Sequence, residues 1–145
     1  DVGLVFLAYA PPGIGAARVA EPGKLDRSEG ASTTSVGYGT TTPRDRKAPF
    51  NPAMGDEKRR TRRSMLRRVV DETWGLWSIQ SYVCSGDSGG GIFLNRITSV
   101  AQEVLAANVS DGGQDCRRHN NNNRLDTLSI QNWISEALRQ RTGAP

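Results

Sequence analysis

One serine of this chain stands in a setting that suits nucleophilic chemistry. Ser88 lies in the run Cys84-Ser85-Gly86-Asp87-Ser88-Gly89-Gly90. A serine attacks a carbonyl carbon only when a base takes its proton and when preorganised donors meet the oxyanion that forms. Flanking glycines allow a tight turn that exposes the Ser88 hydroxyl and directs the backbone N–H groups of Gly86 and Ser88 to one point. The same composition also suits a plain surface turn, so the run alone leaves both interpretations open.

The segments around this run read mainly as strands and turns. Strands are predicted where apolar or β-branched residues lie between turn residues, over 1–7, 32–42, 78–84, 91–94 and 103–110. Segment 58–70 fits either a long basic strand or a helix, because its periodicity does not decide. Residues 119–123 are polar and are predicted to form an exposed loop.

The C-terminal segment has the spacing of an amphipathic helix. Its apolar stripe consists of Ile130, Trp133, Ile134, Ala137 and Leu138. Asp126, Thr127 or Ser129 can serve as the N-cap of this helix. The sequence therefore predicts an all-β body with one terminal helix.

Composition limits the class of protein. The chain has 145 residues, 36% of them hydrophobic, which suits one globular domain. No run of 18 apolar residues occurs, so no membrane span is predicted. The net charge is +4, and residues 44–68 carry ten of the nineteen Lys and Arg residues. Such a run is more often a solvated face than a nucleic-acid site, so no nucleic-acid partner is predicted.

Metal and cofactor sites are not predicted either. Two cysteines and the single His119 are too few for a zinc site, whereas an even number of cysteines suits one disulfide in an oxidising compartment. Residues 13–18 begin like a dinucleotide-binding loop but lack the third glycine, and Pro22-Gly23 interrupts the helix that should follow.

The run around Ser88 resembles the nucleophile motif of the trypsin-like (chymotrypsin-fold) serine proteases. Four other stretches are similar to that family and lie in the family's order, namely Asp1-Val2-Gly3-Leu4-Val5-Phe6-Leu7, Val36-Gly37-Tyr38-Gly39, Leu105 to Ser110 with Gly112 and Cys116, and Gln131-Asn132-Trp133-Ile134. Arg124-Leu125-Asp126-Thr127 is similar to secreted bacterial members in particular. The resemblance implies that residues 1–145 are the second, C-terminal Greek-key β-barrel of a two-barrel fold, followed by the C-terminal helix.

The same resemblance implies a serine endopeptidase that works through an acyl-enzyme. Ser88 would be the nucleophile, Asp1 the carboxylate that orients the catalytic histidine, and the N–H groups of Gly86 and Ser88 the oxyanion hole. Asp87 would be the carboxylate that receives a new N-terminal ammonium after zymogen cleavage. The implied disulfide joins Cys84 and Cys116 beside a substrate pocket, whose residues would be Tyr82, Val83, Ser110, Asp111 and Gly112.

Departures from the family pattern shape the expected function. The family's catalytic histidine precedes the position of Asp1, whereas this chain has only His119, downstream of Ser88. We therefore expect a C-terminal fragment, inactive alone, whose partners are an upstream half of the same protease domain and a polypeptide substrate. Tyr82 stands where members that prefer Arg or Lys carry Asp, so cleavage after Arg or Lys is not expected. The implied location is secreted or periplasmic.

Two other functions stay open at this point. A non-catalytic, protease-like binding module would need an upstream half that lacks the histidine. Gly86-x-Ser88-x-Gly90 also satisfies the nucleophile elbow of α/β-hydrolases, with Asp115 and His119 downstream in the right order. That elbow must lead into a helix, whereas the glycines at 89–91 favour a strand.

Overall fold

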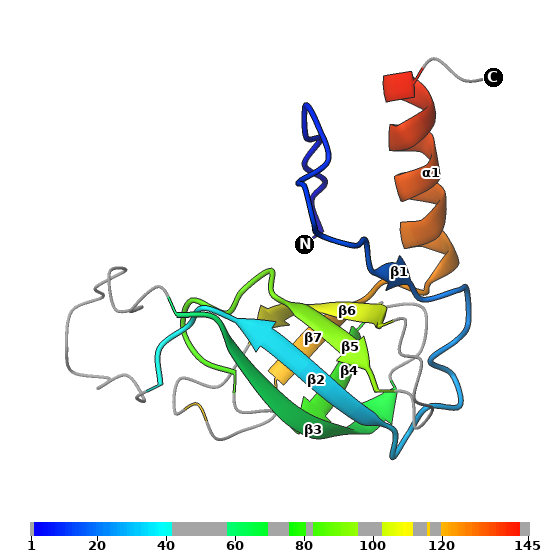
Figure 1. The fold of residues 1–145 in the computed structure, drawn as a ribbon. Helices are drawn as coiled ribbons and strands as arrows, with labels where there is room; N and C mark the ends of the chain where they lie inside the picture. Colours follow the sequence, from blue (N-terminus) through cyan, green and yellow to red (C-terminus); the bar gives the residue numbers. More distant parts are fainter. Residues whose placement is uncertain are drawn as a thin grey trace.

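The structure is a computed structural model that describes residues 2–41, 58–69, 76–80, 83–95, 103–111, 116 and 120–142. Seven strands and one helix occur within these ranges (Figure 1). In chain order they are β1 (Arg18–Val19), β2 (Ser32–Gly37), β3 (Arg60–Val69), β4 (Leu76–Gln80), β5 (Gly91–Leu94), β6 (Val104–Asp111), β7 (Asn120–Arg124) and α1 (Leu128–Thr142). The prediction of a mostly β protein with one C-terminal helix is confirmed.

Antiparallel pairing links six of the strands so that each has two neighbours. The pairs are β2 with β3, β3 with β4, β4 with β7, β7 with β6, β6 with β5, and β5 with β2. The short strand β1 adds to β6 in parallel. Figure 1 shows the strands wrapped around a common interior, with α1 projecting from one end.

The interior combines a small apolar cluster with buried polar side chains. The cluster contains Leu25, Leu66, Val83, Ile92, Ala106, Ala107 and Val109. Buried polar residues on the strands include Thr33 and Ser35 of β2 and Asn122 of β7. Because side chains of a strand alternate between two faces, β2 places Thr33 and Ser35 inside while Ser32 is exposed.

The structure decides the one segment that the sequence left open and corrects the predicted loop at 119–123. Residues 60–69 form strand β3, in which Leu66 is buried while Arg63 and Arg67 on the opposite face are exposed. The predicted loop at 119–123 is wrong, because residues 120–124 form β7. The backbone of β7 finds partners on both β4 and β6, and this pairing outweighs the low strand propensity of asparagine.

The predicted strand over residues 1–7 is wrong for the part that the structure describes. Residues 2–10 form no strand, and Val5 is 85% exposed. A strand needs a neighbour to satisfy its backbone groups, and residues 2–10 have none among the described strands. The other strand predictions are confirmed with changed ends: β2 is Ser32–Gly37, β4 is Leu76–Gln80 with Val83 and Cys84 outside any strand, and β5 spans the predicted residues.

The terminal helix α1 is confirmed, and Thr127 is its cap. The Thr127 hydroxyl accepts the Ile130 N–H at 3.4 Å. Its apolar stripe is incompletely covered, since Trp133 is 42% and Leu138 47% exposed. The N-terminal segment and α1 project from the same end of the sheet (Figure 1), with the Arg141 guanidinium 5.9 Å from the Phe6 ring centre. Among the described residues, no helix has both the length and the apolar character needed to cross a membrane.

Candidate active site

Two tight turns in succession lead into β5, and Ser88 is the second residue of the later one. The Asp87 N–H donates to the Cys84 carbonyl at 3.0 Å, and the Gly90 N–H donates to the Asp87 carbonyl at 2.8 Å. Each turn has a glycine at its third position, Gly86 with φ +94° and Gly89 with φ +80°. These values suit type II turns, which require a positive φ that glycine adopts without strain. The glycines thus form the tight turn that the sequence predicts, and Ser88 is exposed on it.

The second turn is fixed to strand β6. The Gly89 N–H donates to the Val109 carbonyl at 2.7 Å, and the Val109 N–H donates to the Gly90 carbonyl at 2.9 Å. These two bonds place Ser88 near the end of β6, where Ser110 follows Val109. Ser110, a predicted pocket residue, is half-buried there.

The Asp87 carboxylate fixes the first turn to the segment after β2. One carboxylate oxygen accepts the Gly39 N–H at 2.7 Å, and the other accepts the Cys84 N–H at 2.7 Å. A Cβ atom added at Gly39 would lie 2.6 Å from the Asp87 carboxyl carbon, and one at Gly37 would also collide with this side chain. The glycines at 37 and 39 therefore allow the close approach of Asp87. The structure thus brings together two of the stretches on which the resemblance rests.

Two further contacts hold the same turn. The Thr40 N–H donates to the Ser85 carbonyl at 3.0 Å. The Thr40 hydroxyl lies 3.1 Å from the sulfur of Cys84. The predicted disulfide between Cys84 and Cys116 is present, with the two Cα atoms 4.8 Å apart, and both cysteines are buried.

Two backbone donors beside Ser88 remain available. Within the described part of the chain, neither the Gly86 N–H nor the Ser88 N–H donates a hydrogen bond. Both residues are exposed. An exposed hydroxyl and two available N–H donors on neighbouring residues are groups that an attack on a carbonyl uses, together with a base that takes the hydroxyl proton.

The other predicted site residues have different positions. Val83 is only 6% exposed and packs in the apolar cluster, so its side chain offers little surface to a ligand. Asp111 ends strand β6. The predictions for Asp1, Tyr82, Gly112 and His119 fall outside the described residues, as does that for Asp115.

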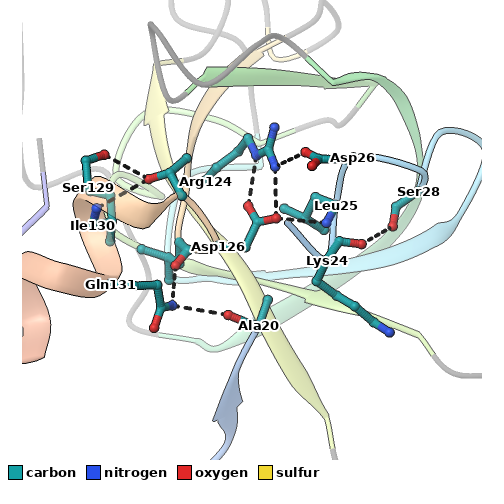
Figure 2. A network of polar contacts seen from close by, with 12 residues as sticks. Ala20, Lys24, Leu25, Asp26, Ser28, Arg124, Asp126, Ser129, Ile130 and Gln131 are labelled. Atoms are coloured by element: carbon teal, nitrogen blue, oxygen red, sulfur yellow. Dashed lines mark hydrogen bonds and ion pairs between the residues drawn. The ribbon is translucent and has the colours of Figure 1, made fainter. Parts of the chain in front are cut away.

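Sequence reasoning missed a buried ionic network at the base of α1 (Figure 2). The Arg124 guanidinium contacts Asp126 at 2.8 Å and Asp26 at 2.6 Å. The Asp126 carboxylate also accepts the Leu25 N–H at 2.8 Å. Hydrogen bonding to Asp126 raises the pKa of the Arg124 guanidinium above its ordinary value, so this side chain stays charged.

In the same region, the fourth residue of α1 binds one nearby and one distant backbone carbonyl. The Gln131 side-chain amide donates to the carbonyls of Ala20 at 3.1 Å and Leu125 at 2.6 Å. The sequence feature that points to the ionic network is the string Arg124-Leu125-Asp126-Thr127, which carries two opposite charges two residues apart. Its structural partners lie about a hundred residues earlier, so the string by itself does not reveal them.

No family model and no curated protein matches this chain. Among the described residues, no group of three His, Cys, Asp or Glu side chains could hold a metal ion. The interpretation of the site therefore depends on its own geometry and on the motifs of the sequence.

Proposed function

We propose that this chain is the C-terminal half of a serine endopeptidase of the trypsin-like type. The observation that carries the proposal is the exposed Ser88 in the second of two successive turns, with the N–H groups of Gly86 and Ser88 available as donors. The turns are also hydrogen-bonded to the segment after β2 and to β6. A surface turn without function does not need these bonds, whereas a nucleophile and its oxyanion donors must be held in place.

The strand order supports the fold expected for this half. β2, β3 and β4 pair in succession, and β5 then pairs with β2, which gives the spatial order β5-β2-β3-β4. Three consecutive strands with a fourth beside the first are the order of a Greek key. The further pairs β5–β6, β6–β7 and β7–β4 connect the two ends of this order. A Greek-key barrel as the second of two barrels fits these pairings.

In the proposed reaction, Ser88 attacks the scissile carbonyl carbon and passes its proton to an imidazole supplied by the upstream half. The carbonyl oxygen becomes an oxyanion that accepts hydrogen bonds from the Gly86 and Ser88 N–H groups. The C–N bond then breaks, the leaving amine takes the proton from the imidazolium, and an acyl-enzyme remains. Water then attacks the ester carbonyl carbon and passes its proton to the imidazole. The ester C–O bond breaks, and the Ser88 oxygen takes that proton back. Asp1 is the proposed partner that orients the imidazole.

Uncovered apolar surface supports an upstream half as partner. Val5 is 85%, Leu7 65% and Tyr9 79% exposed in the N-terminal segment. Trp133 and Leu138 of the α1 stripe are also exposed, and exposed apolar side chains in such number suit an interface. The Cys84–Cys116 disulfide supports an oxidising, secreted or periplasmic location.

The alternatives differ in what they require. A protease-like binding module would use the same braced turn without an imidazole, so a histidine upstream distinguishes the two. The α/β-hydrolase elbow requires a helix after the serine, whereas Gly91–Leu94 is strand β5. The following strand therefore favours the trypsin-like interpretation of Ser88.

The test uses this chain joined to the polypeptide encoded directly upstream of it. We expect a fluorophosphonate probe to label Ser88 and a peptide library to be cleaved. Ser88→Ala removes the label, whereas Ser135→Ala, an exposed serine on α1, keeps it. An upstream sequence without a histidine, or equal labelling of both variants, contradicts the proposal.

A further inference from the structure

The direction of the Gly86 N–H is tied to that of the Ser85 carbonyl. The two groups belong to one peptide unit, which is planar and trans, so they point in opposite directions. Any contact that fixes the Ser85 carbonyl therefore also fixes the Gly86 N–H. In this structure the Ser85 carbonyl accepts the Thr40 N–H at 3.0 Å.

The turn residues alone do not determine this direction. Gly86 has φ +94°, which gives a type II turn. In a type I turn the same position has φ of about −90°, and the central peptide is reversed. Glycine adopts both values readily, because it has no Cβ atom. A reversed peptide would point the Ser85 carbonyl, an acceptor, to the side where the Gly86 N–H now lies.

We infer that the backbone N–H of Thr40 is a positioning group that holds the Gly86 N–H in the orientation needed to bind the oxyanion. The inference rests on the proposed function and adds a residue that acts through another. The contacts of Thr40 that carry the inference go to the Ser85 carbonyl and to the Cys84 sulfur, both in the turn. Thr40 acts by making the type II form of the turn the stable one.

Contacts on both sides hold the Thr40 N–H in place. The preceding residue, Gly39, donates its N–H to the Asp87 carboxylate at 2.7 Å. The Thr40 hydroxyl lies 3.1 Å from the Cys84 sulfur, which can only accept because it is in a disulfide. The segment 39–40 and the turn are thus joined by three contacts from three different groups. This arrangement predicts that the Gly86 N–H is directed before substrate binds.

Hydrogen exchange of the joined wild-type enzyme tests the inference without any substitution. We expect the Thr40 amide to be protected, and the Gly86 amide to exchange quickly. Addition of a peptide boronate, whose tetrahedral oxygen occupies the oxyanion position, should then protect Gly86. A Thr40 amide that exchanges as fast as that of Gly86 in the free enzyme overturns the inference.

A matched pair of variants gives the kinetic test. Thr40→Pro removes the N–H and the hydroxyl, whereas Thr40→Ala removes only the hydroxyl. Because the oxyanion forms only in the transition state, the loss should fall on kcat rather than KM. We expect kcat of Thr40→Pro to be about 10²-fold below that of Thr40→Ala, the effect typical of one lost oxyanion donor.

The outcomes separate this inference from the proposed function. If the joined wild-type enzyme is not labelled by a fluorophosphonate, the proposed function fails and the inference fails with it. If the wild type is labelled but the two variants have equal kcat, only the inference is overturned. If Thr40→Pro does not fold, the exchange measurement on the wild type decides.

Discussion

The Arg124 Nε lies 2.8 Å from the Asp126 carboxylate, and both side chains are almost completely buried. The same guanidinium also contacts Asp26, whose side chain is 63% exposed. Arg124 therefore has one buried and one solvated partner, and the contributions of the two aspartates to stability can be compared directly. Figure 2 shows that Asp126 also accepts the Leu25 N–H and that Gln131 of α1 donates to the Ala20 carbonyl, so two side chains connect residues 20–25 to the start of α1.

Asp126→Asn should destabilise the chain far more than Asp26→Asn. Removing one partner of a buried ion pair leaves a buried charge uncompensated, which costs about 3–5 kcal/mol. An exposed partner contributes only about 0–1 kcal/mol. Urea unfolding of the oxidised proteins measures both differences. Equal losses of unfolding free energy for the two variants would show that the buried pair with Asp126 stabilises the chain no more than the solvated pair with Asp26.

Gly39→Ala should weaken the contact between Gly39 and the Asp87 carboxylate, which holds the turns around Ser88. The new methyl group would lie 2.6 Å from the Asp87 carboxyl carbon, so either the side chain or the backbone must move. Overpacking of this kind costs about 1–3 kcal/mol. We expect lower stability and lower kcat in the joined enzyme. Gly15→Ala is the matched control, because nothing lies within 4 Å of its added Cβ atom; a loss as large in the control would refute a specific role for Gly39.

Replacing both cysteines should reduce turnover while most of the fold remains. The bond joins residues 32 positions apart, and closing such a loop stabilises by about 3–4 kcal/mol in the chain-entropy model. Cys84 begins the first turn and its sulfur lies against the Thr40 hydroxyl, so loss of the disulfide releases this turn first. We expect Cys84→Ser, Cys116→Ser to lower kcat in the joined enzyme while circular dichroism changes little. Unchanged kcat would be evidence against this anchoring role.

The isolated 145-residue chain should not react with a fluorophosphonate probe. No imidazole is expected near Ser88, so its proton has no acceptor and the rate falls to what oxyanion stabilisation provides. Intact-mass analysis after incubation measures the labelling. Rapid, stoichiometric labelling of Ser88 would show that a base lies within this chain, and His119→Ala would then identify whether His119 is that base.

The joined enzyme should cleave after residues other than Arg and Lys. Tyr82 stands at the position where the resembled family carries an acid in its Arg- and Lys-specific members, and a cation without a carboxylate partner would lose its hydration uncompensated. Cleavage of a peptide library, read by mass spectrometry, measures this preference. Dominant cleavage after Arg or Lys would contradict it, and an Asp111→Asn variant would then test Asp111 as the acid.

The sequence by itself determined the elements that local chemistry controls. Strand β5 follows directly from the apolar residues after Gly91, and α1 from a stripe of period 3.6 with Thr127 as cap. The turns around Ser88 were predictable because only glycine adopts the positive φ of Gly86 and Gly89 without strain. These features depend on residues within one or two turns of each other.

Only the tertiary structure decided the features that depend on distant partners. Asparagines form strand β7 because β4 and β6 satisfy their backbone groups, whereas the apolar residues 2–7 form no strand because no described neighbour pairs with them. The contacts of Thr40 with Ser85 and of Arg124 with Asp26 join residues 45 and 98 positions apart. Nothing in the sequence marks which group a backbone N–H or an arginine will contact, so the contact that holds the turn and the contact of Arg124 with Asp26 are visible only in the folded chain.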